Sequence, residues 1–217
     1  MRADERVRSF FAVALPEEAR ETAAQLAGRL RQKERGEGVR WVRPESYHLT
    51  LRFLGNVDRE AIPGLAECVA AQIAPAAPFA MRLGAALVFP SPRQPRVVAL
   101  AVEPESALAS LAEGVERGVQ VAGLPAERRR FRAHLTLGRV RNRRFPSLEG
   151  EAAVDCPSFP VDEIVLYQSD LQRTGAVYTA LERIALQGRG PGADASGDPA
   201  GSDGDLFRGV PTRTDSP

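Results

Sequence analysis

The chain has 217 residues, of which 43% are hydrophobic and 26% are charged. These proportions are typical of a globular protein, and the length allows one sizeable core or one domain built of two lobes. The net charge of +1 excludes a chain whose overall field attracts nucleic acid, so affinity for an anion must come from a local patch. The charged N-terminal stretch and the two cysteines predict a cytoplasmic protein without a signal peptide, disulfide framework or membrane segment.

Short apolar runs bounded by proline or glycine predict strands, and longer runs with helical periodicity predict helices. In chain order, the first predicted elements are a strand at 7–14, a helix from 17 to about 33, a strand near 41–42, a strand at 47–54 and a helix from about 58 to 73. The later ones are strands at 79–89 and 96–103 joined by a proline-rich loop, a helix at 106–121, and strands at 131–140, 159–167 and 176–184. This irregular alternation favours an α+β fold with largely antiparallel sheets.

The composition changes at Gln187, after which the sequence is dominated by Gly, Ala, Pro, Asp and Ser. Such a segment has almost nothing to bury, so residues 187–217 are predicted to be a disordered tail. Residues 1–186 are then a single domain, and the protein is expected to be a monomer.

The chain contains only two histidines, and both open the same tetrapeptide: His48-Leu49-Thr50-Leu51 and His134-Leu135-Thr136-Leu137. Side chains alternate between the two faces of a strand, so each histidine shares a face with the threonine two residues later, and the leucines take the other face. Internal repetition also indicates two similar halves. If these halves are related by a pseudo-two-fold axis, two imidazoles and two hydroxyls meet across one cleft.

Two histidines and two threonines suit hydrolysis of a phosphodiester by general acid–base catalysis. One imidazole accepts a proton from the attacking group and the other donates a proton to the departing oxygen, since both forms of histidine exist near neutral pH. Threonine hydroxyls can donate hydrogen bonds to the phosphate oxygens. No third metal-ligand candidate stands at a suitable spacing and no glycine-rich nucleotide loop is present, so neither metal nor cofactor is expected.

These motifs resemble those of the 2H phosphoesterase superfamily, and their flanks are similar to its RNA 2′,3′-cyclic phosphodiesterase branch, also known as 2′-5′ RNA ligases. The segments that carry the resemblance, in chain order, are 8–16 (RSFFAVALP), 41–55 (WVRPESYHLTLRFLG), 89–93 (FPSPR) and 131–139 (FRAHLTLGR). The family often has proline where this chain has Ala133, and we expect only a small effect of that difference on the geometry.

The resemblance implies a bilobal fold whose two pseudo-symmetric halves, with mainly antiparallel sheets and flanking helices, face each other across an active-site cleft. It also implies hydrolysis of a terminal 2′,3′-cyclic phosphate on RNA, tRNA fragments included, to a 2′-phosphate. His48 would be the proton donor to the 3′ oxygen and His134 the proton acceptor from water. The residues alone support the pair but do not say which histidine has which role.

Further candidates for contacts to the substrate phosphate share a predicted strand face with a histidine or follow a motif. They are Thr50, Thr136, Arg52, Arg132 and Arg139. Phe11 is a candidate for stacking on a base or ribose, or else a buried strand aromatic.

The residues leave three alternative functions open. The substrate could instead be a small cyclic phosphate or a 2′-5′-linked oligonucleotide, the reaction could run as 2′-5′ ligation, or the protein could bind RNA or nucleotides without turnover. A module that only binds has no need of both histidines.

Overall fold

Two antiparallel sheets and three α-helices make up the described part of the chain, which in this computed structural model comprises residues 6–33, 38–91, 93–141, 148, 156–172 and 175–188. The first sheet has the strand order β3-β1-β8-β9, with β1 at Arg6–Ala14, β3 at His48–Asp58, β8 at Glu163–Gln172 and β9 at Gly175–Ala185. The second has the order β2-β6-β5-β4-β7, with β2 at Val39–Trp41, β4 at Phe79–Ser91, β5 at Gln94–Glu103, β6 at Leu135–Val140 and β7 at Phe159–Val161. The α+β prediction with antiparallel sheets is confirmed.

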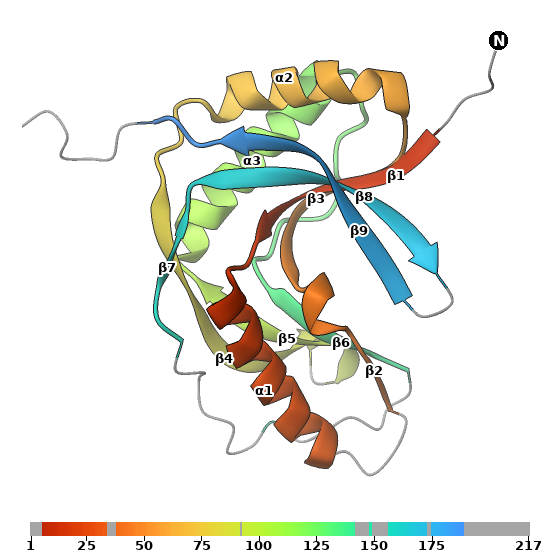
Figure 1. Cartoon of the computed structure of the whole chain (residues 1–217), viewed down its shortest axis with the longest axis vertical. Helices are drawn as coiled ribbons and strands as arrows, with labels where there is room; N and C mark the ends of the chain where they lie inside the picture. The colour runs from red at the N-terminus through yellow and green to blue at the C-terminus, as the bar shows by residue number, and fades with distance from the viewer. Residues whose placement is uncertain are drawn as a thin grey trace, which may run out of the picture.

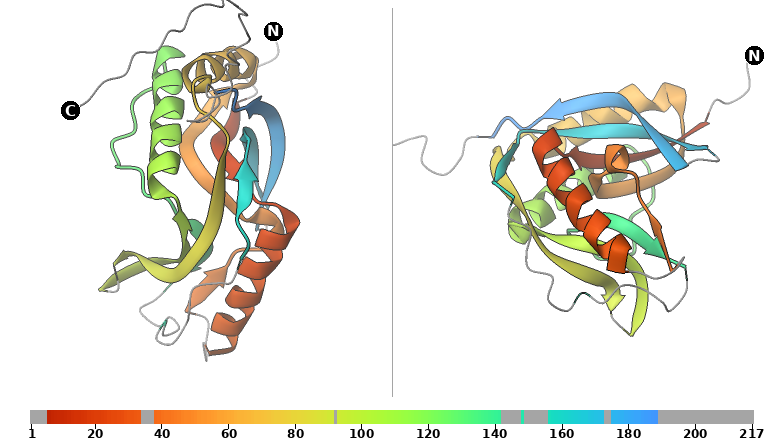
Figure 2. Two further views of the ribbon diagram at one scale, coloured as in Figure 1. Left: turned by 90° about the vertical axis from the view of Figure 1, so that its left-hand side faces the viewer. Right: turned by 60° about the horizontal axis from the view of Figure 1, so that its bottom comes forward.

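The helices cover the outer faces of the sheets (Figures 1 and 2). Helices α2 (Ile62–Ile73) and α3 (Glu105–Val121) pack on each other, with α2 beside β9 and α3 beside β3, while α1 (Glu17–Lys33) lies beside β6. Two 3-10 turns, η1 (Pro44–Ser46) and η2 (Arg59–Ala61), complete the described elements. The sheet faces that the helices leave uncovered are therefore available to form a site.

Helix α1 shows how the sequence determines this arrangement. Its buried residues Ala19, Ala23, Leu26 and Leu30 recur at helical spacing and form one apolar stripe, with acidic residues in the first turn and basic residues in the last turn. Helices α2 and α3 approach closely at Gly118, where a Cβ atom would lie 2.5 Å from the Cα atom of Val69. A larger residue there would force the two helices apart.

Each of the two motif strands contains a β-bulge at the same place in the motif. In the β1–β3 pair, Ala12 faces Thr50 and Phe11 faces Arg52, so Leu51 is an extra residue. In the β5–β6 pair, Ala99 faces Thr136 and Val98 faces Gly138, so Leu137 is an extra residue. A bulge reverses the alternation of side chains beyond it, which decides what each strand presents to the site.

Several predicted element boundaries were wrong, and the strand predicted at 159–167 is two strands, β7 and β8. Strand β3 continues beyond Leu54 to Asp58, with Gly55 at φ 74°, a conformation that glycine adopts without strain. Strands β4 and β5 extend into the proline-rich stretch and pair as far as Ser91 and Gln94. The strand predicted from Phe131 begins only at Leu135. None of the helices within the described ranges combines the length and apolar character needed to cross a membrane, and the predicted tail lies outside those ranges apart from its first two residues.

Candidate active site

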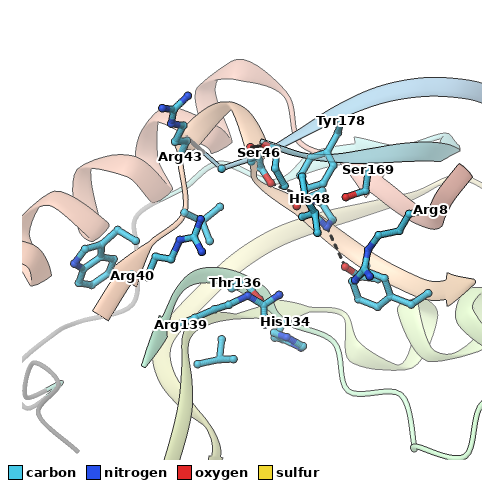
Figure 3. A pocket seen from close by; sticks show the side chains of 18 residues that line it. Arg8, Arg40, Arg43, Ser46, His48, His134, Thr136, Arg139, Ser169 and Tyr178 are labelled. Carbon is cyan, nitrogen blue, oxygen red and sulfur yellow. Dashed lines mark hydrogen bonds between the residues drawn. The ribbon is translucent and has the colours of Figure 1, made fainter. Parts of the chain in front are cut away.

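A cavity of about 350 Å³ is lined by the histidine and the threonine of both tetrapeptide motifs (Figure 3). His48 and Thr50 line it from β3 in the first sheet, and Thr136 lines it from β6 in the second sheet, with His134 immediately before that strand. The prediction that the two motifs meet in one place is therefore confirmed by the geometry. Arg139 also lines this cavity, as predicted.

Each histidine ring makes the same kind of hydrogen bond to the backbone. Nδ1 of His48 lies 2.8 Å from the carbonyl oxygen of Ser46, and Nδ1 of His134 lies 2.8 Å from the carbonyl oxygen of Arg132. A carbonyl oxygen only accepts hydrogen bonds, so Nδ1 carries a proton in each ring. In the neutral rings Nε2 is then the basic nitrogen, and that of His48 accepts a hydrogen bond from the Thr50 hydroxyl at 3.0 Å.

Aromatic rings enclose His48. Its ring centroid lies 4.7 Å from that of Phe10 and 4.9 Å from that of Tyr178, which meets it edge-on. Burial among these rings disfavours the charged imidazolium and lowers the pKa of His48 to about 4, against the opposing effect of the Ser46 carbonyl. The positive charge of Arg139 lowers this pKa further.

The surroundings of His134 are similar. Its ring lies 4.5 Å from that of Phe89, and the guanidinium of Arg132 lies over the same phenyl ring at 4.1 Å. Burial again lowers the pKa, with the Arg132 carbonyl acting in the opposite direction and the charges of Arg132 and Arg139 adding to the decrease. Both imidazoles therefore favour the neutral form in the unliganded protein.

Because of the bulges, the next residue of each strand to face the cavity after the threonine is three positions on, not two. Without Leu51 as an extra residue, Arg52 would share the face of His48 and Thr50; with it, Phe53 lines the cavity instead. The bulge at Leu137 likewise brings Arg139 into the cavity. The fifth residue after each histidine therefore faces the site, a phenylalanine in one half and an arginine in the other.

The predicted role of Arg52 in binding phosphate is wrong, because its side chain points away from the cavity. It is 8% exposed, and its Nε donates to the Glu116 carboxylate at 2.5 Å. Its two terminal nitrogens donate to the carbonyl oxygens of Phe53 and Pro125. Arg52 thus ties the strand of the first motif to α3 and to the segment that leads into the second motif.

We expect Arg52→Met to lower the free energy of unfolding by about 2–4 kcal/mol, because it leaves the partly buried Glu116 carboxylate without its cation. Burial raises the pKa of Glu116, but hydrogen bonds from Gln120, the Glu127 amide and Arg52 outweigh burial and lower that pKa. Urea unfolding of Arg52→Met, Glu116→Gln and the double variant measures the coupling. Fully additive effects would show that the two side chains do not interact.

Two other candidate residues do not line the cavity. Phe11 is 0% exposed and belongs to the hydrophobic core, which confirms the alternative of a buried strand aromatic and excludes contact with a base or ribose; the ring that faces His48 is that of its neighbour Phe10. Residues 131–134 are not part of a strand, so the parity argument for Arg132 was wrong: its guanidinium lies over Phe89 rather than along the cavity wall.

Sequence reasoning missed several side chains that line the cavity. They are Arg8 from β1, Arg40 and Arg43 from β2 and the segment after it, Phe53 from β3, Ser169 from β8 and Tyr178 from β9. Arg8, Arg43 and Phe53 lie in segments that carry the family resemblance, but no pattern in those segments assigned them to the site. Ser169 and Tyr178 were missed because the strand order brings β8 and β9 beside β1 from the far end of the chain. Among the lining residues that the structure describes, none is acidic, and the described ranges contain no group of three His, Cys, Asp or Glu side chains that could hold a metal ion.

The profile of one protein family, described as LigT like Phosphoesterase, matches the chain twice, at residues 13–99 and 100–178. Each match contains one of the two motifs, which confirms the predicted two-half organisation. A Thermus thermophilus protein named RNA 2′,3′-cyclic phosphodiesterase is 33% identical over 205 residues, covering 88% of this chain and all of that protein. A protein of the same name from Methanothermobacter thermautotrophicus is 34% identical, covering 83% of this chain and all of its own length.

Solved structures agree with these matches. The crystal structure of a Thermus thermophilus protein superposes with a TM-score of 0.70 at 32% identity, covering 84% of this chain and 100% of the other. The crystal structure of E. coli LigT complexed with 3′-AMP superposes with a TM-score of 0.71 at 30% identity, covering 84% of this chain and 99% of the other. The family profile matches most of the chain, and the relatives are at least 30% identical over most of its length, so the chain belongs to the LigT-like phosphoesterase family, as its resemblance to the 2H phosphoesterases predicted.

Proposed function

We propose that this protein hydrolyses 2′,3′-cyclic phosphate termini of RNA to 2′-phosphates, without a metal ion, with His48 and His134 as the acid–base pair. The observation that carries the proposal is the matched pair of imidazoles. Each has Nδ1 bound to the carbonyl two residues earlier, and both line one cavity. The relatives named RNA 2′,3′-cyclic phosphodiesterase support the choice of substrate.

In the proposed reaction, a water molecule attacks the phosphorus atom and gives its proton to Nε2 of His134. The bond between phosphorus and the 3′ oxygen breaks, and Nε2 of protonated His48 donates a proton to that oxygen. The products are a 2′-phosphate and a free 3′ hydroxyl, with one water consumed. Each of the two proton transfers contributes about 10²–10⁴-fold to the rate.

The hydroxyls and cations around the histidines suit the phosphate group. Thr50 and Thr136 stand two residues after the histidines and can donate to its non-bridging oxygens. Arg139 and Arg8 add positive charge beside them, and neither has a carboxylate partner among the described residues. These groups stabilise the negative charge that the transition state carries.

The low pKa of His48 fits a proton donor that is charged only when substrate is bound. A cyclic phosphate brings a negative charge next to an imidazole whose charged neighbours are otherwise cations, which favours the imidazolium and raises the pKa. His48 then acquires its proton as the substrate enters. In the unliganded cavity, where burial and Arg139 outweigh the effect of the Ser46 carbonyl, it releases this proton again.

We infer that residues 1–186 carry the activity and that the protein acts as a monomer. We also infer that it acts in the cytoplasm, where its substrates include the cyclic phosphate ends of tRNA fragments.

The proposal is tested with a short RNA that ends in a 2′,3′-cyclic phosphate, incubated with the purified full chain in the presence of EDTA. We expect conversion to a 2′-phosphate, identified by its resistance to a phosphatase that acts only on 3′-phosphate ends. A product with a 3′-phosphate would contradict the assignment of the leaving group. Absence of turnover by the folded protein would contradict the proposed activity.

A further inference from the structure

We propose that Arg40 and Arg43 form a second phosphate subsite, which binds a phosphate ester on the 5′ oxygen of the nucleotide whose cyclic phosphate lies between His48 and His134. This inference rests on the proposed function and specifies its substrate class. The preferred substrate is then a nucleotide that carries a 5′ phosphate group, as every nucleotide within an RNA strand does, rather than a lone nucleoside cyclic phosphate.

The cavity has an excess of positive charge. Four arginines line the cavity, whereas a cyclic phosphate carries a single negative charge. The lining residues are Arg8, Arg40, Arg43 and Arg139, and no ion pair joins any of them to a described carboxylate. Some arginines on the outside of the molecule, such as Arg82 with Glu103, do have such partners. One monoanion therefore leaves most of the charge in this cavity uncompensated.

Two positive charges face each other across strands β2 and β6. Arg40 of β2 lies directly opposite Arg139 of β6, so their side chains leave the sheet on the same face, and both are exposed toward the cavity. Like charges in directly opposed positions destabilise a sheet. An anion bound on this face removes the repulsion, so the pair is suited to a ligand that brings negative charge to both arginines.

Arg40 and Arg43 differ from Arg139 in their relation to the two histidines. The charge of Arg139 lowers the pKa of both histidines, whereas Arg40 and Arg43 are not among the described charges that act on either ring. Figure 3 shows Arg40, Arg43 and Arg139 on one side of the cavity and Arg8 on the other. Arg139 thus acts on the histidines, and Arg40, which faces it across the two strands, lies with Arg43 on the same side of the cavity.

The backbone holds this second subsite in a fixed place relative to the second motif. The amide of Val42, between the two arginines, donates to the carbonyl of Leu137 at 2.9 Å, and Leu137 is the bulged residue of the motif. Gly138 lets the strand with Arg40 approach, since a Cβ atom there would lie 2.5 Å from Val39 and 3.2 Å from the Trp41 ring. A shift of Arg40 relative to His134 would break these contacts.

The test compares three substrates with the same terminal base: a nucleoside 2′,3′-cyclic phosphate, the same compound with a 5′-phosphate, and a dinucleotide ending in the cyclic phosphate. The variant is Arg40→Ala/Arg43→Ala. The matched control, Arg96→Ala/Arg117→Ala, removes the same charge from exposed arginines that do not line the cavity. For each protein, kcat/KM is measured on all three substrates.

We expect the unaltered protein to favour the dinucleotide over the nucleoside by about tenfold or more, and the Arg40/Arg43 variant to lose most of this ratio while the control keeps it. A gain for the 5′-phosphorylated nucleoside equal to that of the dinucleotide would show that the phosphate group alone is recognised. A gain for the dinucleotide alone would show that the subsite reads the phosphodiester of a strand. An equal loss on all three substrates would overturn the subsite and leave the proposed function standing.

Binding provides a readout that does not depend on turnover. The affinity for a fluorescent dinucleotide ending in a 2′-phosphate is measured by anisotropy at several salt concentrations. Two phosphate contacts in a single strand contribute about 1.4 to the slope of log K against log salt, and the Arg40/Arg43 variant should lose part of that slope. An unchanged slope would overturn the subsite. Failure of all three substrates to react, with this slope change present, would overturn the proposed function alone.

Discussion

Replacing either His48 or His134 by alanine should lower kcat/KM on RNA ending in a cyclic phosphate by about 10²–10⁴-fold. Each substitution removes one of the two proton transfers, and the rest of the cavity still binds the phosphate. Because the histidines act on one transition state, the double variant should lose less than the product of the two single losses. A quenched-flow or gel assay with EDTA present measures these rates.

Asparagine variants separate chemistry from structure. The amide of His48→Asn or His134→Asn can still donate to the carbonyl that each ring contacts through Nδ1, but it transfers no proton at neutral pH. These variants should unfold at nearly the same temperature as the unaltered protein and be as inactive as the alanine variants. Retained activity in either one would contradict the acid–base role of that histidine.

A substrate with sulfur in place of the 3′ oxygen distinguishes the two roles. A thiolate departs without a proton, because the pKa of a thiol is about 8.5. The His48 variants should recover most of their rate on this substrate, and the His134 variants should not. Recovery in the His134 variants instead would reverse the assignment of donor and acceptor.

The activity should also depend strongly on pH. We expect kcat/KM to follow a bell-shaped profile whose two limbs both lie below pH 6.5, the ordinary pKa of histidine, with the lower limb near pH 4. Burial disfavours the imidazolium in the free protein, so each ring gains its proton only at lower pH than usual. The profile of kcat should lie at higher pH, because bound phosphate stabilises the imidazolium and raises both pKa values.

NMR titration measures the same pKa values without turnover. The chain has only two histidines, so the two Cε1–H signals are assigned by recording the spectra of the two single variants. Both signals should titrate below pH 6.5 in the free protein and move to higher pH on addition of inorganic phosphate. Arg139→Gln should raise both pKa values, whereas Arg96→Gln should leave them unchanged. Titration of both rings near pH 6.5 would contradict the proposed effect of burial.

The sequence was sufficient to predict the fold class, most of the elements and the meeting of the two motifs. A repeated tetrapeptide that uses every histidine is a strong pattern, and apolar runs bounded by proline locate strands such as Arg6–Ala14 well. The side chains that face the cavity were predicted correctly as far as alternation is regular, which holds within β3 from His48 to Thr50 and from His134, immediately before β6, to Thr136.

Prediction failed where the backbone departs from regular alternation. Arg52 was placed by counting in twos from His48, and the bulge at Leu51 lies between Thr50 and Arg52. A bulge depends on the register of the neighbouring strand, which no local pattern in the sequence reveals. The cavity arginines of β1 and β2 and Tyr178 of β9 were missed for a related reason: their position depends on strand order across the whole chain.

The shared bulge has a consequence for the direction in which a ligand lies. The backbone repeats itself around the cavity, but at the fifth position after each histidine one half offers the partly exposed ring of Phe53 and the other offers the guanidinium of Arg139. The two halves therefore differ in charge at this position, although both contain the same bulge. A ligand with a charged end and an apolar end therefore has one favourable orientation in the cavity, with its charged end at Arg139 and its apolar end at Phe53.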